Sequence, residues 1–314
     1  MNPDKIIRTA VVGVGHLGQH HARIYSEMPG VRLAAVVDTD EKQGRKIAKQ
    51  YRTAYCKMAS EIIDSVDAVN IATPTVSHYE MAKIFIERGV AALVEKPITA
   101  DPVQAEKLVS LSEKKGVILQ IGHVERFNAA VQAARNYIKD PRFIEVDRLS
   151  PYPMRSLDIG VVLDLMIHDI DIILSFVSSP VKKIDSMAAA VLSKYEDIAN
   201  CRIAFENGCV ANITASRVSY KAERKFRVFE GNQYITLDFQ KQRLAVYRKK
   251  SGIIKSVKDI EIIKPRIKKT EPLKSELADF ISCVREGRVP EVSGRRGLAA
   301  LKLVLEIMNS IKEK

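Results

Sequence analysis

Three glycines near the N-terminus, in the stretch AVVGVGHLGQHHARIY, limit the fold of this chain more than any other feature. Gly13, Gly15 and Gly18 follow an apolar β-branched run and precede a helical pattern. In this spacing the first glycine allows a tight turn, the second lets the backbone approach a pyrophosphate, and the third lets the helix pack close to the strand. The motif therefore predicts a strand, a loop and a helix that bind a dinucleotide.

Strand and helix patterns alternate from Ile6 to about Ile121. This alternation is typical of an α/β Rossmann domain, with a doubly wound parallel sheet covered by helices on both faces. One helix has Asp101 as a candidate N-cap, Pro102 at its first position and Gly116 after its end. The predicted strands are IIRTAVV, VRLAAVV, DAVNIA, AALVE and VILQI.

The alternation of strand and helix patterns ends at about Gly122. Strand-like runs such as CRIAFENGCVANITASRV, KFRVFEGNQYITLDF and RLAVYR follow one another without helices between them, which predicts an α+β domain with a mostly antiparallel open sheet. Two amphipathic helices are expected at the C-terminus. We therefore expect a cofactor-binding domain over 1–122 and a substrate and oligomerisation domain over 123–314, whose C-terminal helix could pack back on the first.

The charge is strongly positive but unevenly placed. The formal net charge is +12, and much of the excess lies between Lys241 and Lys269, where basic residues greatly outnumber Asp259 and Glu261. Such a surface can be a solvated lysine-rich face or an electrostatic funnel for a phosphate-bearing substrate. Because no basic stripe is interleaved with aromatic residues, we do not expect nucleic-acid binding.

Cysteine usage and the apolar stretches indicate a cytoplasmic protein. The four cysteines form no CxxC pair, which suits a reducing compartment and argues against a structural zinc site. The N-terminus lacks the pattern of a signal peptide. The longest apolar stretch contains Asp164, His168, Asp169 and Asp171, which would be costly in lipid. We therefore expect no membrane insertion.

The end of the second predicted strand bears on the choice of cofactor. Asp38 lies 20 residues after Gly18, where a carboxylate accepts hydrogen bonds from the ribose 2′-hydroxyl. The same carboxylate repels a 2′-phosphate, and no arginine follows it immediately. NAD is therefore favoured over NADP, although Arg45 or Lys46 could still reach the site.

A lysine follows the strand AALVE. In open parallel sheets ligands bind beyond the carboxyl ends of the strands, so Lys96 should project into the cofactor crevice. Pro97 restricts Lys96 to an extended conformation and so directs its side chain. The alternative is an ordinary surface lysine at the end of a strand.

A second group of polar residues interrupts the apolar segment DIGVVLDLMIHDIDIIL. On a helix, Asp164, His168 and Asp171 have i, i+4 and i+7 spacing and share one face. An acid/base pair, in which Asp164 or Asp171 orients His168, accounts for this face best. A histidine satisfied by carboxylates in the core and a metal site are the alternatives, although no further ligand cluster is evident.

These residues suit the oxidation of an alcohol. Hydride transfer to a nicotinamide requires a base that removes the hydroxyl proton, and His168 suits that role at neutral pH. Lys96 would polarise the same oxygen and stabilise the developing alkoxide.

Together the motifs resemble the Gfo/Idh/MocA family of NAD(P)-dependent sugar and polyol oxidoreductases, over nearly the whole chain. The motifs that carry the resemblance are GVGHLG, ATPTVSHYEMA, EKP and the D-x-x-x-H of Asp164 and His168. The resemblance implies a homo-oligomer formed through the open sheet, and catalysis by Lys96, Asp164 and His168. The cofactor-binding residues it implies are Gly13, Gly15, His16, Leu17, Gly18, Asp38, Thr73, Pro74, His78, Glu95 and Lys96.

The chain departs from the family pattern at two places. Met166 and Ile167 replace the usual small residue before the histidine, and Ala129 stands where a proline is common. These departures concern the shape of the substrate pocket. The substrate-binding residues expected are Lys96, Arg126, Asn128, Tyr152, Arg155, Asp164 and His168.

Further segments, including GHVERFNAAV and PLKSELADFISCVREG, resemble the family members that oxidise the 3-hydroxyl of UDP-N-acetylglucosamine for lipid A biosynthesis. A PLP aminotransferase would then act on the keto product. Arginines suit bidentate recognition of a diphosphate, and Arg126, Arg148, Arg155 and Arg217 lie in candidate pocket segments. The alternatives are a dehydrogenase of a free polyol such as inositol and a catalytically silent NAD-binding regulator.

Overall fold

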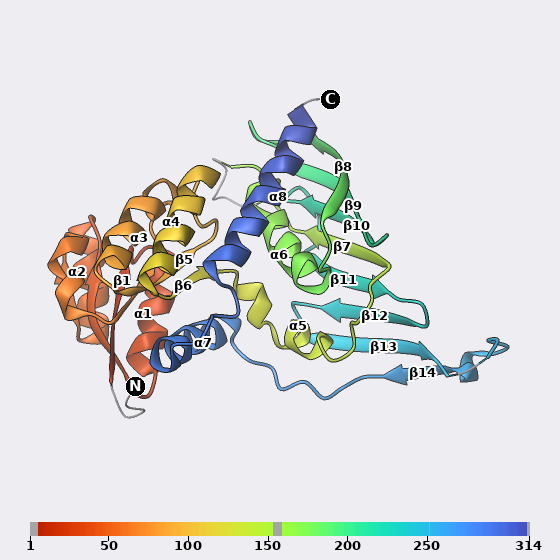
Figure 1. Ribbon diagram of the computed structural model, residues 1–314, viewed down its shortest axis with the longest axis horizontal. Helices are drawn as coiled ribbons and strands as arrows, with labels where there is room; N and C mark the ends of the chain where they lie inside the picture. Colours follow the sequence, from red (N-terminus) through yellow and green to blue (C-terminus); the bar gives the residue numbers. More distant parts are fainter. Residues whose placement is uncertain (1–5, 153–158, 251, 313–314) are drawn as a thin grey trace. The chain divides into compact units, whose positions relative to one another are not determined.

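The computed structural model describes residues 6–152, 159–250 and 252–312 and divides into two units (Figure 1). The first unit is Met1–Val124 with Leu273–Leu301, and the second is Glu125–Pro272 with Lys302–Lys314. The segment 273–301 thus joins the first unit, because Leu277, Phe280 and Ile281 are buried in the core of that unit. The sequence predicted a second domain over 123–314, from which the C-terminal helix could pack back on the first.

The first unit contains a six-stranded parallel sheet with the order β3-β2-β1-β4-β5-β6. This order confirms the predicted doubly wound Rossmann sheet. The five predicted strands are present, and a short strand that was not predicted, β3, pairs with β2. The strands are β1 (Ile7–Val12), β2 (Val31–Val37), β3 (Ala54–Cys56), β4 (Ala68–Ile71), β5 (Ala91–Glu95) and β6 (Leu119–Gly122).

Helix α4 of the first unit begins and ends where local chemistry predicts. In α4 the Asp101 side chain accepts a hydrogen bond from Val103 N (2.8 Å), and Gly116 closes the helix at a φ of +64°. Helix α7 contributes buried side chains to the core of the same unit. The helices are α1 (Gly18–Glu27), α2 (Glu41–Tyr51), α3 (His78–Glu87), α4 (Pro102–Lys115) and α7 (Pro272–Glu286).

The second unit contains an eight-stranded sheet with the order β14-β13-β12-β11-β7-β10-β9-β8. Among the strand pairs of this sheet, all described, β7 and β10 are parallel and the others antiparallel, so the predicted mostly antiparallel sheet is confirmed. The strands are β7 (Phe143–Leu149), β8 (Val181–Ala189), β9 (Ile198–Phe205), β10 (Val210–Ser216), β11 (Glu223–Phe229), β12 (Gln233–Asp238), β13 (Arg243–Lys249) and β14 (Ile260–Ile263).

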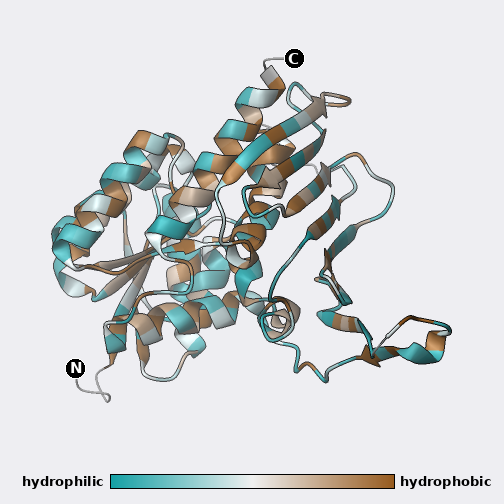
Figure 2. Cartoon of the chain, turned by 45° about the vertical axis from the view of Figure 1, so that its right-hand side comes forward, coloured by the Kyte–Doolittle hydropathy of each residue, from teal (hydrophilic) through white to brown (hydrophobic). Residues whose placement is uncertain are grey.

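Alternation of side chains gives this sheet two different faces, and apolar and polar residues alternate along its strands (Figure 2). Ile144, Val146 and Arg148 of β7 are buried, whereas the residues between them are half-exposed. On the half-exposed face, four aromatic rings form a row across β7, β11, β12 and β13 with centroid separations of 5.7, 4.9 and 5.5 Å, the first pair tilted and the other two stacked. They are Phe143, Phe229, Tyr234 and Tyr247.

The helices of the second unit include an irregular segment at the predicted Asp-His motif. A π-helical turn, η5 (Val162–Met166), leads directly into α6 (Ile167–Phe176). The remaining helices are α5 (Ala129–Ala134) and α8 (Gly294–Lys312), of which residues 302–312 belong to this unit. Within the described ranges, none of the helices has the length and apolar character that crossing a membrane requires.

Candidate active site

The three glycines of the loop between β1 and α1 differ in how closely other atoms surround them. Gly13 has a φ of +82°, and a Cβ there would lie 2.8 Å from the carbonyl oxygen of Ala72. A Cβ on Gly18 would collide with the carbonyl oxygen of Gly13. A Cβ on Gly15 would have no atom within 4 Å. Two glycines therefore allow close packing, and the third leaves backbone open to a ligand such as a pyrophosphate.

The helix that follows this loop presents its N-terminus beside Gly15. Helix α1 begins at Gly18, and Leu17 at its N-cap makes no side-chain capping hydrogen bond. His16 and Leu17 are exposed in the same loop. The positive end of the helix dipole favours an anionic group at this position.

Asp38 connects the end of β2 to the glycine loop. Its Oδ2 accepts a hydrogen bond from Val14 N (2.8 Å), and its Oδ1 accepts one from Asp40 N (2.9 Å). Gln43 Nε2 donates to the carbonyl oxygen of Val14 (2.7 Å). These bonds fix the carboxylate at the mouth of the loop, where a ribose is expected.

A cavity of about 590 Å³ lies against these groups, within the first unit. Its volume is in the range of cofactor and ligand sites. Five predicted residues line it, namely Gly13, Gly15, Asp38, Thr73 and Pro74. Lys57, Met58 and Ala59 line it as well and were not predicted. They follow β3, and the position after a parallel strand is the signal that could have identified them.

Arg45, one of the two residues that could have reached a 2′-phosphate, is engaged elsewhere. Its Nε lies 2.7 Å from Glu41 Oε1, and its guanidinium lies 5.1 Å from the centre of the Tyr55 ring. The Tyr55 hydroxyl donates to the carbonyl oxygen of Asp38 (3.1 Å). Arg45 and Tyr55 are therefore held by other groups of the protein.

His78 joins two loops of the first unit. Its Nδ1 lies 2.9 Å from the carbonyl oxygen of Pro97, and its Nε2 lies 2.9 Å from that of Thr73. The side chain is buried, with 1% exposed. His78 therefore holds the loop after β4 against the loop after β5, and its influence on a cofactor would come through Thr73 and Lys96.

A buried chain of polar groups leads to Glu95, the first residue of EKP. The Tyr25 hydroxyl donates to Asn70 Oδ1 (2.5 Å), so Asn70 Nδ2 is the donor to His21 Nδ1 (2.7 Å). The remaining nitrogen of His21, Nε2, lies 3.1 Å from Glu95 Oε1. The sequence did not single out His21, although a histidine three residues after Gly18 on the inward face of α1 was a visible signal.

The surroundings of Glu95 and Tyr25 set the protonation states of these two side chains. Burial raises the pKa of Glu95, but the hydrogen bond from His21, with the charges of His21 and Lys96, outweighs it and holds the pKa below its ordinary value. Burial and the nearby carboxylate of Glu276 raise the pKa of Tyr25 well above its ordinary value. Tyr25 therefore remains a hydrogen-bond donor and Glu95 an anion.

Lys96 follows Glu95 at the carboxyl end of β5. Its backbone N–H donates to Glu95 Oε2 (3.2 Å), and the Lys96–Pro97 peptide bond is cis. The side chain is half-buried. The backbone of the candidate catalytic lysine is therefore held by the residue that His21 contacts.

The Asp-His segment of the second unit differs from the regular helix that was expected. Asp164 lies in the π-helical turn η5, and His168 lies in the first turn of α6. Both are half-buried, whereas Asp171 is buried. A π-helical turn has more residues per turn than an α-helix, so the expected i, i+4 and i+7 face is altered, and such turns occur frequently at functional sites.

The other two acidic residues of this segment face arginines. Asp171 Oδ1 lies 3.7 Å from Arg126 Nη1, and Asp169 accepts two hydrogen bonds from Arg148 (2.6 and 2.8 Å). Glu125 lies 3.4 Å from Arg148. Burial lowers the pKa of Arg148, but Asp169 and Glu125 outweigh it and keep the pKa above its ordinary value. Since Asp171 is engaged by Arg126, Asp164 is the better candidate for orienting His168.

Two predicted substrate residues of the second unit have structural contacts. Arg126 is 3% exposed and donates to the carbonyl oxygen of Asp171 (3.1 Å). Asn128 caps α5, accepting from Ala130 N (3.1 Å) and donating to Phe239 O (3.0 Å). These contacts indicate that both residues shape the unit from inside. Arg155 lies outside the described residues.

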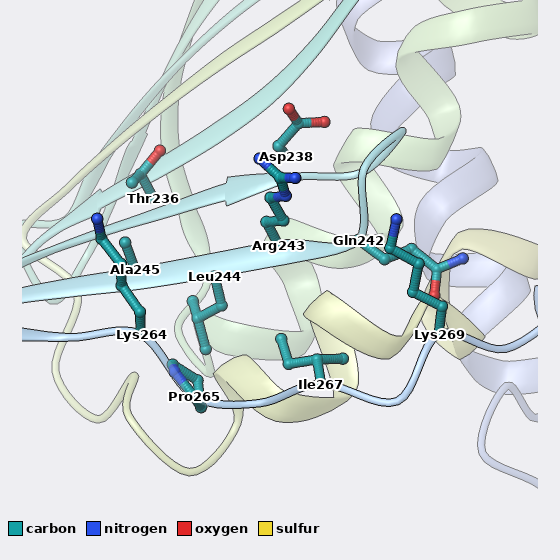
Figure 3. Close-up of a pocket in the computed structure, with 10 residues that line it drawn as sticks. All are labelled: Thr236, Asp238, Gln242, Arg243, Leu244, Ala245, Lys264, Pro265, Ile267 and Lys269. Atoms are coloured by element: carbon teal, nitrogen blue, oxygen red, sulfur yellow. The ribbon is translucent and has the colours of Figure 1, made fainter.

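A second cavity, of about 470 Å³, lies beside β12 and β13 (Figure 3). Arg243, Lys264 and Lys269 line it together with Asp238. None of the predicted catalytic or cofactor residues lines it. It is therefore a separate, cationic depression on the second unit.

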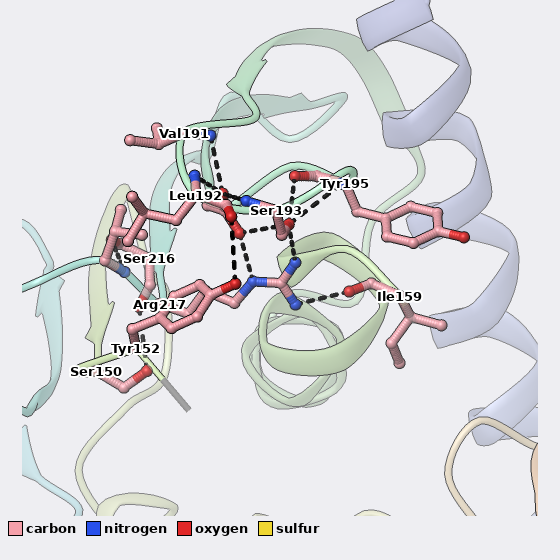
Figure 4. Close-up of polar contacts among 11 residues, drawn as sticks. Ser150, Tyr152, Ile159, Val191, Leu192, Ser193, Tyr195, Ser216 and Arg217 are labelled. Carbon is pink, nitrogen blue, oxygen red and sulfur yellow. Dashed lines mark hydrogen bonds and ion pairs between the residues drawn. The ribbon is translucent and has the colours of Figure 1, made fainter. Parts of the chain in front are cut away.

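Arg217, which the sequence placed in a candidate pocket segment, pairs with the buried carboxylate of Asp197 (Figure 4). Its Nε lies 2.7 Å from Asp197 Oδ1, and its Nη1 donates to the carbonyl oxygen of Ile159 (2.7 Å). Asp197 Oδ2 accepts from the backbone N–H groups of residues 191, 192 and 193 at 2.8, 2.6 and 2.9 Å. Tyr152 donates to Leu192 O (3.5 Å) on the same loop. Asp197 and Arg217 therefore organise the loop beside Tyr152, and the sequence did not predict Asp197.

Metal ligation is not indicated by the residues that the structure describes. Among them, no group of three or more His, Cys, Asp or Glu side chains could hold a metal ion.

Family models match both units. Residues 7–123 match the model described as an oxidoreductase family with an NAD-binding Rossmann fold, and residues 120–235 match the GFO/IDH/MocA C-terminal domain. The chain belongs to the Gfo/Idh/MocA family. The resemblance seen in the sequence is thereby confirmed, and the protein is an oxidoreductase.

Individual relatives in the Gfo/Idh/MocA family extend over the whole chain. UDP-N-acetylglucosamine 3-dehydrogenase of Acidithiobacillus ferrooxidans is 34% identical over 298 residues, covering 94% of this chain and 95% of that protein. A solved structure of that enzyme has a TM-score of 0.93 at 31% identity and covers 98% of both chains. The scyllo-inositol 2-dehydrogenase (NAD(+)) of Bacillus subtilis is 25% identical over 328 residues, covering 98% of this chain and 94% of that protein.

Proposed function

We propose that the protein is an NAD-dependent dehydrogenase that oxidises the 3-hydroxyl of UDP-N-acetylglucosamine. The observation that carries the proposal is its 34% identity to UDP-N-acetylglucosamine 3-dehydrogenase over 94% of the chain. The corresponding value for the scyllo-inositol dehydrogenase is 25%. The glycine loop, with open space at Gly15, supports binding of the cofactor.

Bound NAD would supply the acceptor for a hydride from the sugar carbon. In this proposal His168 removes the hydroxyl proton, and Asp164 orients the imidazole. Lys96 donates a hydrogen bond to the same oxygen and stabilises the negative charge that develops there. His21 and Glu95 position the backbone of Lys96.

The proposal of NAD over NADP depends on Asp38. Its carboxylate is fixed by two backbone N–H groups and would repel a 2′-phosphate. The pairing of Arg45 with Glu41 removes the nearest compensating arginine. Replacing Asp38 by Ser is expected to narrow the preference for NAD, measured as the ratio of kcat/KM for the two cofactors.

A free polyol is the second candidate substrate, because three of the four arginines expected to hold a diphosphate are buried against carboxylates. Arg126, Arg148 and Arg217 have Asp171, Asp169 and Asp197 as partners. A diphosphate would then need other donors, among which Arg155 remains a prediction. The catalytically silent regulator is disfavoured, because Lys96, Asp164 and His168 are all retained.

The cellular setting is also proposed. The stacked aromatic rings on the half-exposed sheet face support a homo-oligomer, a dimer or a tetramer, formed through that face. Four cysteines without disulfide bonds suit the cytoplasm. The keto product would pass to a PLP aminotransferase in lipid A amino-sugar synthesis.

The test is a steady-state assay of nicotinamide reduction with NAD and NADP in parallel. UDP-N-acetylglucosamine is compared with free N-acetylglucosamine and with inositols, and a PLP aminotransferase with its amino donor removes the keto product. Activity with the nucleotide sugar alone supports the proposal. Activity with inositols alone would transfer it to the second candidate.

Matched variants connect the activity to the proposed residues. Lys96→Met and His168→Asn are each expected to lower kcat by roughly 10²–10⁴. Lys107→Met, an exposed lysine on α4, is the control and should keep full activity. Retained turnover in both site variants would contradict the proposed roles.

A further inference from the structure

The hairpin that connects β13 to β14 ends in an exposed tip, here residues 249, 250 and 252–259. Three apolar side chains of the tip are strongly exposed: Ile253 by 83%, Ile254 by 47% and Val257 by 77%. Figure 2 shows hydrophobic residues at the end of this hairpin. Exposed apolar groups that cluster on one element mark an interaction surface more often than single ones do.

The same tip is strongly cationic. From residue 241 to residue 269 the sequence has eleven lysines and arginines but only Asp259 and Glu261 as acidic residues. Much of the net charge of +12 is therefore concentrated on this part of the second unit. The lysines within the tip are Lys249, Lys250, Lys255 and Lys258.

Hydrogen bonds give the tip a defined shape. Asp259 Oδ2 accepts from Lys255 N (2.8 Å) and from Ser256 N (2.9 Å), and Lys250 N donates to the carbonyl oxygen of Asp259 (3.0 Å). A short 3-10 turn, Val257–Asp259, follows Ser256. The one carboxylate of the tip is thus used inside the turn. The groups that project are apolar or cationic.

A second cationic group lies at the other end of β13. The cavity beside β12 and β13 is lined by Arg243, Lys264 and Lys269 (Figure 3). Arg243 and Lys249 stand at the two ends of β13, and at about 3.3 Å per residue roughly 20 Å separates them, more than a Debye length of about 8–10 Å. The tip and the cavity are therefore two separate cationic groups of the second unit, and the tip is considered by itself.

We propose that the hairpin tip docks the protein reversibly on an anionic bilayer surface. The strength with which a surface element binds a membrane depends on the apolar area that it buries and on its attraction to anionic lipids. The tip supplies both, since its apolar side chains can enter the interface while its lysines contact anionic headgroups. The dehydrogenase would be held at the membrane surface without a spanning segment.

The alternative occupants fit the tip less well. Two copies of the tip facing each other would bring like charges together, which is unfavourable. Nucleic acid would use the lysines but leave Ile253 and Val257 in water, and the tip has no aromatic residue for base stacking. An anionic bilayer satisfies the charge and the apolar side chains together.

The experiment is co-sedimentation of the full chain with lipid vesicles. Vesicles of phosphatidylcholine alone are compared with vesicles that also contain phosphatidylglycerol, at low and at high salt. Binding is expected only to the anionic vesicles, and high salt should weaken it because the lysine contribution is screened. Absence of binding to anionic vesicles at low salt would overturn the proposal.

Paired variants separate the apolar and the cationic contributions. Lys255→Gln with Lys258→Gln should lower vesicle partitioning by roughly fivefold per lysine. Ile253→Ser with Val257→Ser should lower it by roughly tenfold or more. The matched controls are Lys107→Gln with Lys114→Gln, and Ile6→Ser with Val289→Ser, all exposed in the first unit. Controls should bind as the unaltered chain does.

Other outcomes assign the tip to another partner. Equal losses in the tip and control variants would show that net charge alone acts, and would overturn the proposal. If the tip variants change their oligomeric state in the absence of vesicles, the binding partner of the tip is a second copy of the chain, and the proposal is overturned. If the chain is retained on duplex DNA and the same variants lose that retention, the binding partner of the tip is nucleic acid, and the proposal is overturned. Because no tip residue belongs to the proposed catalytic set, dehydrogenase activity without lipid should be unchanged in all variants.

Discussion

The two units hold their candidate functional residues by different means. In the first unit, backbone contacts do most of this: Gly13 and Gly18 pack against carbonyl groups, and Asp38 accepts from two backbone N–H groups. In the second unit, buried ion pairs hold α6, where Asp169 faces Arg148 and Asp171 faces Arg126. In both units the contacts join residues that are distant in the sequence, as Gly13 with Ala72 and Arg148 with Asp169 show. The difference is that buried opposite charges hold α6, so loss of a charge should cost more stability there than in the glycine loop.

The largest effect is expected from Arg148→Met. It leaves Asp169 buried without its bidentate partner, which should lower the free energy of unfolding by about 3–5 kcal/mol. Chemical denaturation measures it. Addition of Asp169→Asn to the same chain removes the buried charge and should restore part of the loss. A loss below about 1 kcal/mol in the single variant would mean that ion pairs do not hold α6.

The glycine loop offers a matched pair of substitutions. Gly18→Ala should lower the free energy of unfolding by about 1–3 kcal/mol, because its Cβ overlaps the carbonyl oxygen of Gly13. Gly15→Ala meets no protein atom and should leave stability within about 0.5 kcal/mol. It should still weaken NAD binding by roughly tenfold. Calorimetric titration with NAD measures this, and unchanged affinity would place the pyrophosphate elsewhere.

Glu95→Gln tests the contact between His21 and Glu95 in the first unit. The pKa of Glu95 lies below its ordinary value of 4.5, so ionised Glu95 stabilises the fold above that pH, and the contribution is lost as the pH falls through the lowered value. The variant should lose about 1 kcal/mol near neutral pH. The difference in Tm between the two proteins should shrink below pH 4.5. A difference that is independent of pH would exclude an electrostatic role.

The smallest effect is expected from Arg45→Ala. Its contacts with Glu41 and Tyr55 are exposed, so the free energy of unfolding should fall by only about 0.5–1 kcal/mol. Affinity for NAD should not change. A marked loss of NADP binding in this variant would show that Arg45 leaves Glu41 to meet a 2′-phosphate.

Features encoded within a short stretch of sequence were predictable. The glycine loop, the caps of α4, the order of strands and helices in the first unit and the antiparallel runs of the second unit all depend on neighbouring residues. Family membership followed from the same motifs and is confirmed by both family models. The candidate roles of Lys96, Asp164 and His168 are predictions that the assays above test.

Other features depend on which elements the fold brings together. The sequence by itself determined the two fold classes and the loop that fits a dinucleotide, because backbone conformation and hydrophobic periodicity are local properties. Only the tertiary structure decided that Arg148 faces Asp169, that Arg217 faces Asp197 and that His21 faces Glu95. A buried charge must find an opposite charge or a hydrogen bond. Its partner is whichever group packing places beside it, at a separation in sequence that no local pattern records.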